Sequence, residues 1–168
     1  MKDILFVDGY NIVHAWKELK YLSKHVNLEA AREKLADIIG EYASYTGMDA
    51  IIVFDAHMVK GAADIEMHKP SVTVIYTKEH ETADSYIEKA VSKYDRYQQS
   101  IYVATSDGAE QMAVFSQGAY RVSARELLNQ IEKKDTERSQ KHSDDPDMQL
   151  GAYIDDETKN KLKDLIDF

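Results

Sequence analysis

The chain has 168 residues, of which 43% are hydrophobic and 10% aromatic, enough to bury the core of one domain. Its 30 acidic residues outnumber its 21 lysines and arginines, and the net charge of −9 argues against nucleic-acid binding through a broad basic face. The absence of cysteine excludes disulfides, thiolate nucleophiles, iron–sulfur clusters and thiolate zinc sites. The longest apolar run covers only residues 50–54, and no signal-peptide core is visible, so we expect a soluble cytoplasmic protein.

Five short segments are predicted to be strands. Four are nearly continuous apolar runs rather than alternating ones, which is typical of parallel strands covered on both faces. In chain order the five segments are residues 4–7, 51–54, 72–76, 101–104 and 119–122. With helices between them, they predict an α/β fold, a three-layer α/β/α sandwich around a central, mostly parallel five-stranded sheet.

The segments between the strands carry apolar residues at helical spacing. This spacing is found at residues 28–42, 83–94 and 112–115, and Ser123 with Glu126 has the spacing of a capping box that opens another helix. Residues 56–71 lack a clear period and are predicted to form a mobile loop. We expect one domain over residues 1–138, then a polar linker and a C-terminal helix, 139–168, that docks on the same domain.

Acidic residues follow the predicted strands. Asp8 and Asp55 come directly after the first and second strands, and Asp107 follows the fourth. Glu81 and Asp84 lie where the third strand passes into its helix. Because ligands of open parallel sheets bind outside the carboxyl ends of the strands, we expect these acids to meet at one edge.

Each acid taken alone also has a structural explanation. Asp8 is able to begin an Asp-Gly turn, Asp107 to cap a helix, and Asp84 to interact with a helix dipole. Taken together they are harder to explain, because two carboxylates about 4 Å apart repel by roughly 4 kcal/mol at an effective dielectric near 20. A divalent cation offsets that repulsion, and an all-oxygen site suits Mg²⁺ or Mn²⁺.

A carboxylate site of this kind favours metal-assisted hydrolysis of phosphate esters, which needs no nucleophilic side chain. The missing motifs agree with this interpretation. The sequence has neither a GxSxG elbow nor an HExxH helix, and Asp8 is not followed by the second aspartate of an aspartyl-phosphate phosphatase.

Four motifs resemble, in order, those of NYN domains, which are PIN-like nucleases: FVDGYN at 6–11, VFDAH at 53–57, HETADSYI at 80–87 and VATSD at 103–107. The segments GAYRVSARELLNQI and YIDDETKNKL extend the resemblance to the bacterial YacP-like branch over essentially the whole chain. The resemblance implies a sheet order 3-2-1-4-5, a Mg²⁺ or Mn²⁺ site and cleavage of single-stranded RNA. It also implies Asp8, Asp55, Asp84 and Asp107 as catalytic, metal-binding acids, with Glu81 as a possible addition.

A second set of residues is predicted to contact substrate. Asn11 is placed either to orient Asp8 or to cap a helix, whereas Tyr10 is interpreted as half-buried core. Thr105 and Ser106 are placed either to contact a phosphate or to cap a helix. The lysines and arginines of this set are placed either to contact the RNA backbone or simply to form a solvated surface. The predicted substrate-binding residues are Asn11, Lys60, Lys69, Thr105, Ser106, Arg121 and Arg125.

The resulting hypothesis is a metal-dependent endoribonuclease that cleaves mRNA on the ribosome, the partner that the resemblance implies. Two alternatives stay open. The chain could be a ribosome- or RNA-binding module whose acids are vestigial, or a nuclease or phosphatase that acts on other RNA or on small phosphates. We also expect the loop at 56–71 to contribute to RNA or ribosome binding, unless it is only a crossover between two strands.

Overall fold

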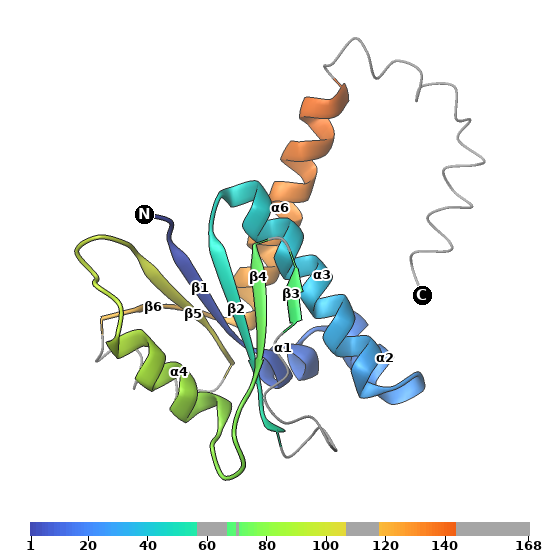
Figure 1. The fold of residues 1–168 in the computed structure, drawn as a ribbon. Helices are drawn as coiled ribbons and strands as arrows, with labels where there is room; N and C mark the ends of the chain where they lie inside the picture. The colour runs from blue at the N-terminus through green and yellow to red at the C-terminus, as the bar shows by residue number, and fades with distance from the viewer. Residues whose placement is uncertain (57–66, 70, 107–117, 144–168) are drawn as a thin grey trace. The chain divides into compact units, whose positions relative to one another are not determined.

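The structure, a computed structural model, describes residues 1–56, 67–69, 71–106 and 118–143 (Figure 1). The chain divides into a unit of Met1–Leu128 and a second unit of Asn129–Phe168. The first contains the whole sheet, and the described part of the second is the continuation of one helix, α6, to Ser143. None of the helices in these residues is long and apolar enough to cross a membrane.

The first unit is built on a six-stranded sheet of order β3-β4-β2-β1-β5-β6. Its strands are β1 (Ile4–Asp8), β2 (Asp49–Phe54), β3 (Met67–Lys69), β4 (Val72–Tyr76), β5 (Ile101–Ala104) and β6 (Tyr120–Val122). Five of them are parallel, and β3 alone pairs antiparallel, with β4. Numbered along the chain, the parallel strands have the order 3-2-1-4-5, so the predicted fold class is confirmed.

Helices cover both faces of this sheet (Figure 1). Among the described residues of the first unit they are α1 (Gly9–Ala15), α2 (Lys17–His25), α3 (Leu28–Thr46) and α4 (Ala83–Ser92). A further helix, α6 (Ala124–Ser143), begins in this unit and continues into the second. On one face, Ile87 and Val91 of α4 pack in one core cluster with Phe6 and Val53. Neighbouring residues of a strand point to opposite faces, so Phe54 lies on the other face, where α3 places Arg32 over the Tyr76 ring.

Local signals set the ends of the helices. The Asn27 side chain caps α3 by accepting from Ala30 N at 2.7 Å, and Gly47 ends that helix in the left-handed conformation at φ 73°. At the start of α6 the predicted capping box is present: Glu126 N donates to Ser123 Oγ at 3.1 Å, and Ser123 N to Glu126 Oε2 at 3.4 Å.

Three details differ from the sequence-based expectation. The end of the predicted loop forms β3, which pairs with β4. Gly9 begins α1 directly after β1, because its missing Cβ lets the Phe54 ring lie against the backbone. Helix α6 continues to Ser143, into the predicted linker. The predicted helix at 112–115 and the terminal helix lie outside the described residues, so the division at residue 138 stays a prediction.

Candidate active site

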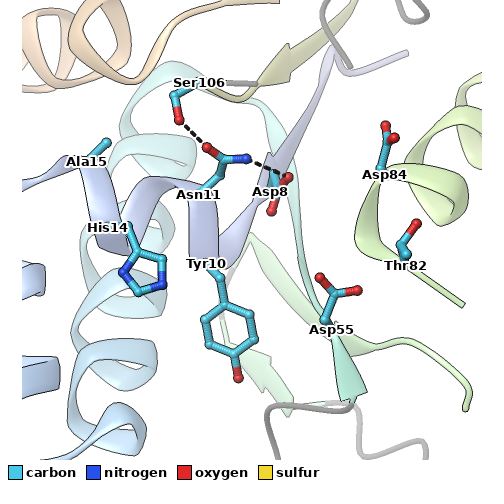
Figure 2. A pocket seen from close by; sticks show the side chains of 9 residues that line it. All are labelled: Asp8, Tyr10, Asn11, His14, Ala15, Asp55, Thr82, Asp84 and Ser106. Atoms are coloured by element: carbon cyan, nitrogen blue, oxygen red, sulfur yellow. Dashed lines mark hydrogen bonds between the residues drawn. The ribbon is translucent and has the colours of Figure 1, made fainter. Parts of the chain in front are cut away.

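A cavity of about 550 Å³ opens at the carboxyl edge of the parallel strands (Figure 2). Side chains from the ends of β1, β2 and β5 and from the starts of α1 and α4 surround it. Its lining residues are Asp8, Tyr10, Asn11, His14, Ala15, Asp55, Thr82, Asp84 and Ser106. Asp8, Asp55 and Asp84, which lie far apart in the sequence, therefore line one space.

Asp8 ends β1 and is only 8% exposed. It occupies the N-cap position of α1, yet its side chain makes no capping hydrogen bond. Instead Asn11 Nδ2 donates to Asp8 Oδ2 at 3.2 Å, and Ser106 Oγ donates to Asn11 Oδ1 (Figure 2). Asn11 thus orients the Asp8 carboxylate and does not cap a helix.

Asp55 follows β2 and reaches the start of α4. Its Oδ1 atom accepts a hydrogen bond of 2.7 Å from the backbone N–H of Ala83, the first residue of that helix. An N–H at this position has no partner within its own helix, and the helix dipole favours a negative charge there. The carboxylate of Asp55 consequently has a structural role as well as a position on the cavity wall.

Asp84 stands in the first turn of α4 and is exposed on the other side of the cavity from Asn11 (Figure 2). Thr82 caps this helix, since its Oγ1 accepts from Ser85 N at 3.1 Å. Glu81, one residue earlier, does not line the cavity. Its carboxylate lies 3.6 Å from Lys89 Nζ on the same helix.

The other predicted site residues are distributed unevenly. Ser106 lines the cavity, whereas Thr105 is fully buried and does not line it, and its N–H donates to Val122 O at 3.1 Å. Arg121 and Arg125 are exposed and do not line it. Asp107 and Lys60 lie outside the described residues, and Lys69 is described only as backbone in β3.

Four lining residues are absent from the predicted site, namely Tyr10, His14, Ala15 and Thr82. His14 lies three residues after Asn11, one helical turn further along the same side of α1, and that spacing was the available signal. Tyr10 belongs to the core, as predicted, and also reaches the cavity: it is 7% exposed and its ring centroid is 4.9 Å from that of Phe54. Burial raises the pKa of the Tyr10 phenol, although Arg32 Nη1 donates to it at 3.4 Å and partly opposes that effect.

The donor set of the cavity consists of oxygen atoms, the ligands that Mg²⁺ and Mn²⁺ prefer. Asp8 and Asp55 each use one carboxylate oxygen in the hydrogen bonds described above, which leaves lone pairs on both side chains for a cation. Among the described residues, no three histidine or acidic side chains form a group close enough to hold a metal ion. The residue types fit a divalent ion, and completing its shell would require water, substrate oxygens or further residues.

A parallel α/β sandwich with carboxylates at the carboxyl edge of its sheet is the architecture of the PIN-like NYN class. The chain belongs to the YacP-like NYN domain family, whose model matches residues 5–167. A protein of Bacillus subtilis (strain 168), uncharacterized protein YacP, is 51% identical over 130 residues, which are 77% of this chain and 75% of that protein.

Solved structures give the same assignment. The crystal structure of Rae1 (YacP) from Bacillus subtilis matches with a TM-score of 0.74 and 42% identity, and covers 97% of this chain and 92% of that one. A crystal structure of a mutant of the same Bacillus subtilis protein matches with a TM-score of 0.72 and 45% identity, over 84% and 81% of the two chains. Membership of the family supports a nuclease role.

Proposed function

We propose that this protein is a metal-dependent endoribonuclease that cleaves single-stranded RNA, with mRNA on the translating ribosome as its substrate. The observation that carries the proposal is the convergence of Asp8, Asp55 and Asp84, from three separate elements, on one cavity. Helix capping does not explain Asp8, because its side chain makes no capping hydrogen bond, and the side-chain cap of α4 is Thr82. A cavity lined by three carboxylates suits a cation and, through it, a phosphodiester.

The side chains that would hold Mg²⁺ or Mn²⁺ are Asp8, Asp55 and Asp84, and the family resemblance adds Asp107. The resemblance also implies Glu81, which would have to leave its ion pair with Lys89 to join them. When bound, such an ion supplies Lewis acidity: it lowers the pKa of a bound water and stabilises charge on the phosphate and leaving oxygen.

The protein's own groups position these acids. The hydrogen bonds from Ser106 to Asn11 and from Asn11 to Asp8 connect the ends of β5 and β1, and they restrict the rotation of the Asp8 carboxylate. The bond from Ala83 N does the same for Asp55. Because these carboxylates are held before substrate arrives, less ordering is needed when the phosphodiester binds.

The net charge of the chain affects its affinity for free RNA. At a net charge of −9, we expect free RNA to bind weakly, since affinity for a polyanion depends on the phosphates that lysine and arginine neutralise. A second surface that positions the enzyme is therefore required, and the family resemblance makes the ribosome that surface.

The test compares two variants of the full chain, Asp8→Asn and Asp84→Asn, with the wild type on a fluorescent single-stranded RNA in Mn²⁺ and in EDTA. We expect internal cuts by the wild type in Mn²⁺ only. Each variant should lose about a thousandfold or more in rate, because several kcal/mol of transition-state stabilisation depend on the ion. Both variants should melt at or above the wild-type temperature in EDTA, since a repulsion between carboxylates has been relieved.

Asp49→Asn is the matched control. Asp49 begins β2 at the opposite edge of the sheet. Within the described residues its side chain makes an exposed ion pair of 3.6 Å with Lys2 and no other hydrogen bond or ion pair, so loss of its charge should leave cleavage unchanged. A wild type that binds Mn²⁺ and RNA but cuts neither RNA nor small phosphates would favour a binding module with vestigial acids. Release of phosphate from small esters, without internal cuts, would favour a phosphatase.

A further inference from the structure

Helix α2 carries a positively charged surface in a protein of net charge −9. Its sequence, KELKYLSKH, contains three lysines and one glutamate, which gives the helix a net charge of +2. Lys17, Lys20 and Lys24 are spaced i, i+3 and i+7, so they lie within about 60° of one another around the helix axis. All three are exposed, and Leu19 on the opposite side is fully buried.

The one acidic side chain of α2, Glu18, forms an ion pair with a lysine of the neighbouring helix α3. Lys34 of α3 places its Nζ atom 3.9 Å from Glu18 Oε1. Among the described residues, the structure gives no ion pair to Lys17, Lys20 or Lys24. Their charges therefore face solvent.

Two aromatic rings lie beside these lysines. Tyr21 is 47% exposed, and its ring stacks on that of His25 with centroids 4.2 Å apart and planes at 29°. Tyr21 follows Lys17 at i+4 and precedes Lys24 by three residues, which places it on the same side of the helix. Single-stranded nucleic acid is bound by this combination, in which cations contact phosphates and exposed rings stack on bases.

The surface also adjoins the candidate active site. Ala15, the last residue of α1, lines the cavity, and only Trp16 separates it from the start of α2. Trp16 is 4% exposed and its Nε1 donates to Ala124 O at 2.8 Å, which anchors this junction to the start of α6. In Figure 1, α1 and α2 follow one another at the end of the sheet where β1 and β2 terminate.

We infer that the exposed side of α2, formed by Lys17, Lys20, Tyr21, Lys24 and His25 and here named the α2 basic face, binds the single-stranded RNA that flanks the cleaved phosphodiester. The inference rests on the proposed function. The lysines would contact phosphates of the flanking segment, and the Tyr21–His25 pair would stack on a base. Such a surface supplies the local positive charge that the cavity, with its three acids, lacks.

The test is the double variant Lys20→Gln/Lys24→Gln, in which glutamine preserves the helix propensity and removes two charges. Its binding to a fluorescent RNA is measured by anisotropy in EDTA across a salt series. The RNA has about 20 nucleotides, which is longer than the roughly 4–16 nucleotides of typical single-strand sites. Each lost phosphate contact should lower the slope of log K against log salt by about 0.7. Two lost contacts correspond to roughly 60-fold weaker binding at about 0.05 M salt and roughly tenfold at about 0.2 M.

Tyr21→Ala is a second variant with a different signature. Loss of stacking should weaken binding about fivefold or more and leave the salt slope unchanged, because no charge is removed. Lys2→Gln/Lys93→Gln is the charge-matched control. Lys2 precedes β1 and Lys93 follows α4, so both lie at the other edge of the sheet, and binding should remain at the wild-type level.

Cleavage in Mn²⁺ separates this inference from the proposed function. RNA of about 20 nucleotides should be cut with a raised KM by Lys20→Gln/Lys24→Gln, whereas an oligonucleotide of about six, near the lower limit of single-strand sites, should be cut as by the wild type. If Asp8→Asn is inactive while the lysine variant binds and cleaves the long RNA normally, only the role of the α2 basic face is wrong. If Asp8→Asn cleaves normally, the proposed active site is wrong.

Discussion

Asp55 has two roles that substitution can separate, a capping hydrogen bond and a negative charge on the cavity wall. In Asp55→Asn the amide oxygen can still accept from Ala83 N, so the start of α4 is preserved and only the charge is lost. In Asp55→Ala both are lost. The N–H of Ala83, a residue only 2% exposed, then lacks its partner at 2.7 Å.

The magnitude follows from that contact. Loss of a capping carboxylate costs about 1–2 kcal/mol. In a chain of this size that lowers the melting temperature by about 2–8 °C. Asp55→Asn should stay within about 2 °C of the wild type, because the lost interaction with the helix dipole is partly offset by weaker repulsion among the acids.

The assay combines thermal unfolding by circular dichroism, with EDTA or Mn²⁺, and RNA cleavage. Mn²⁺ at about a hundred times its Kd should stabilise the wild type by about 2.7 kcal/mol and neither variant. Both variants should be inactive. Wild-type cleavage by Asp55→Asn would refute the placement of Asp55 in the active site, and equal stability of the two variants would refute the capping role.

Two further predictions concern the residues beside Asp8. Gly9→Ala should lower the free energy of unfolding by about 1–3 kcal/mol and slow cleavage, because its Cβ would collide with the Phe54 ring; an unchanged urea midpoint would contradict this. Tyr10→Phe should flatten the alkaline loss of stability. Burial raises the pKa of the Tyr10 phenol, so the folded state keeps the phenol neutral when the unfolded state begins to ionise it. The free energy of unfolding is therefore unaffected by this group below pH about 10 and falls as pH rises through the folded-state pKa. Urea unfolding across that range measures it, and equal losses in both proteins would contradict the assignment.

Four of the five parallel strands were predictable because they are apolar runs that are largely buried, whereas β6 is mostly exposed and carries a weaker signal. β4 and β5 match the predicted bounds, and β1 differs only by including Asp8. β3 was not predictable, since its three residues carry no apolar period and are ordered by pairing with β4. The start of α1 at Gly9 depends on Phe54, which is distant in the sequence.

The candidate site was predictable as far as topology determines it. Parallel strands bring Asp8 and Asp55 to one edge, and the sequence order of the motifs adds Asp84. Side-chain partners were not predictable to the same degree. The hydrogen bond from Ala83 to Asp55 and the ion pair that turns Glu81 toward Lys89 depend on where α4 begins relative to the sheet. The α2 basic face was missed because its charges are obscured in a chain that is acidic as a whole.

The shortness of β3 and β6 has a consequence for aggregation. Each has three residues, and within the described residues they are the outermost strands of the sheet. A long, flat outer strand offers unpaired N–H and C=O groups to other chains, and short outer strands limit this hazard. Behind β3 lies β4, whose sequence VTVIY has no charge and a strong preference for extended structure. By pairing with β4, β3 shields from other chains the strand most able to start aggregation.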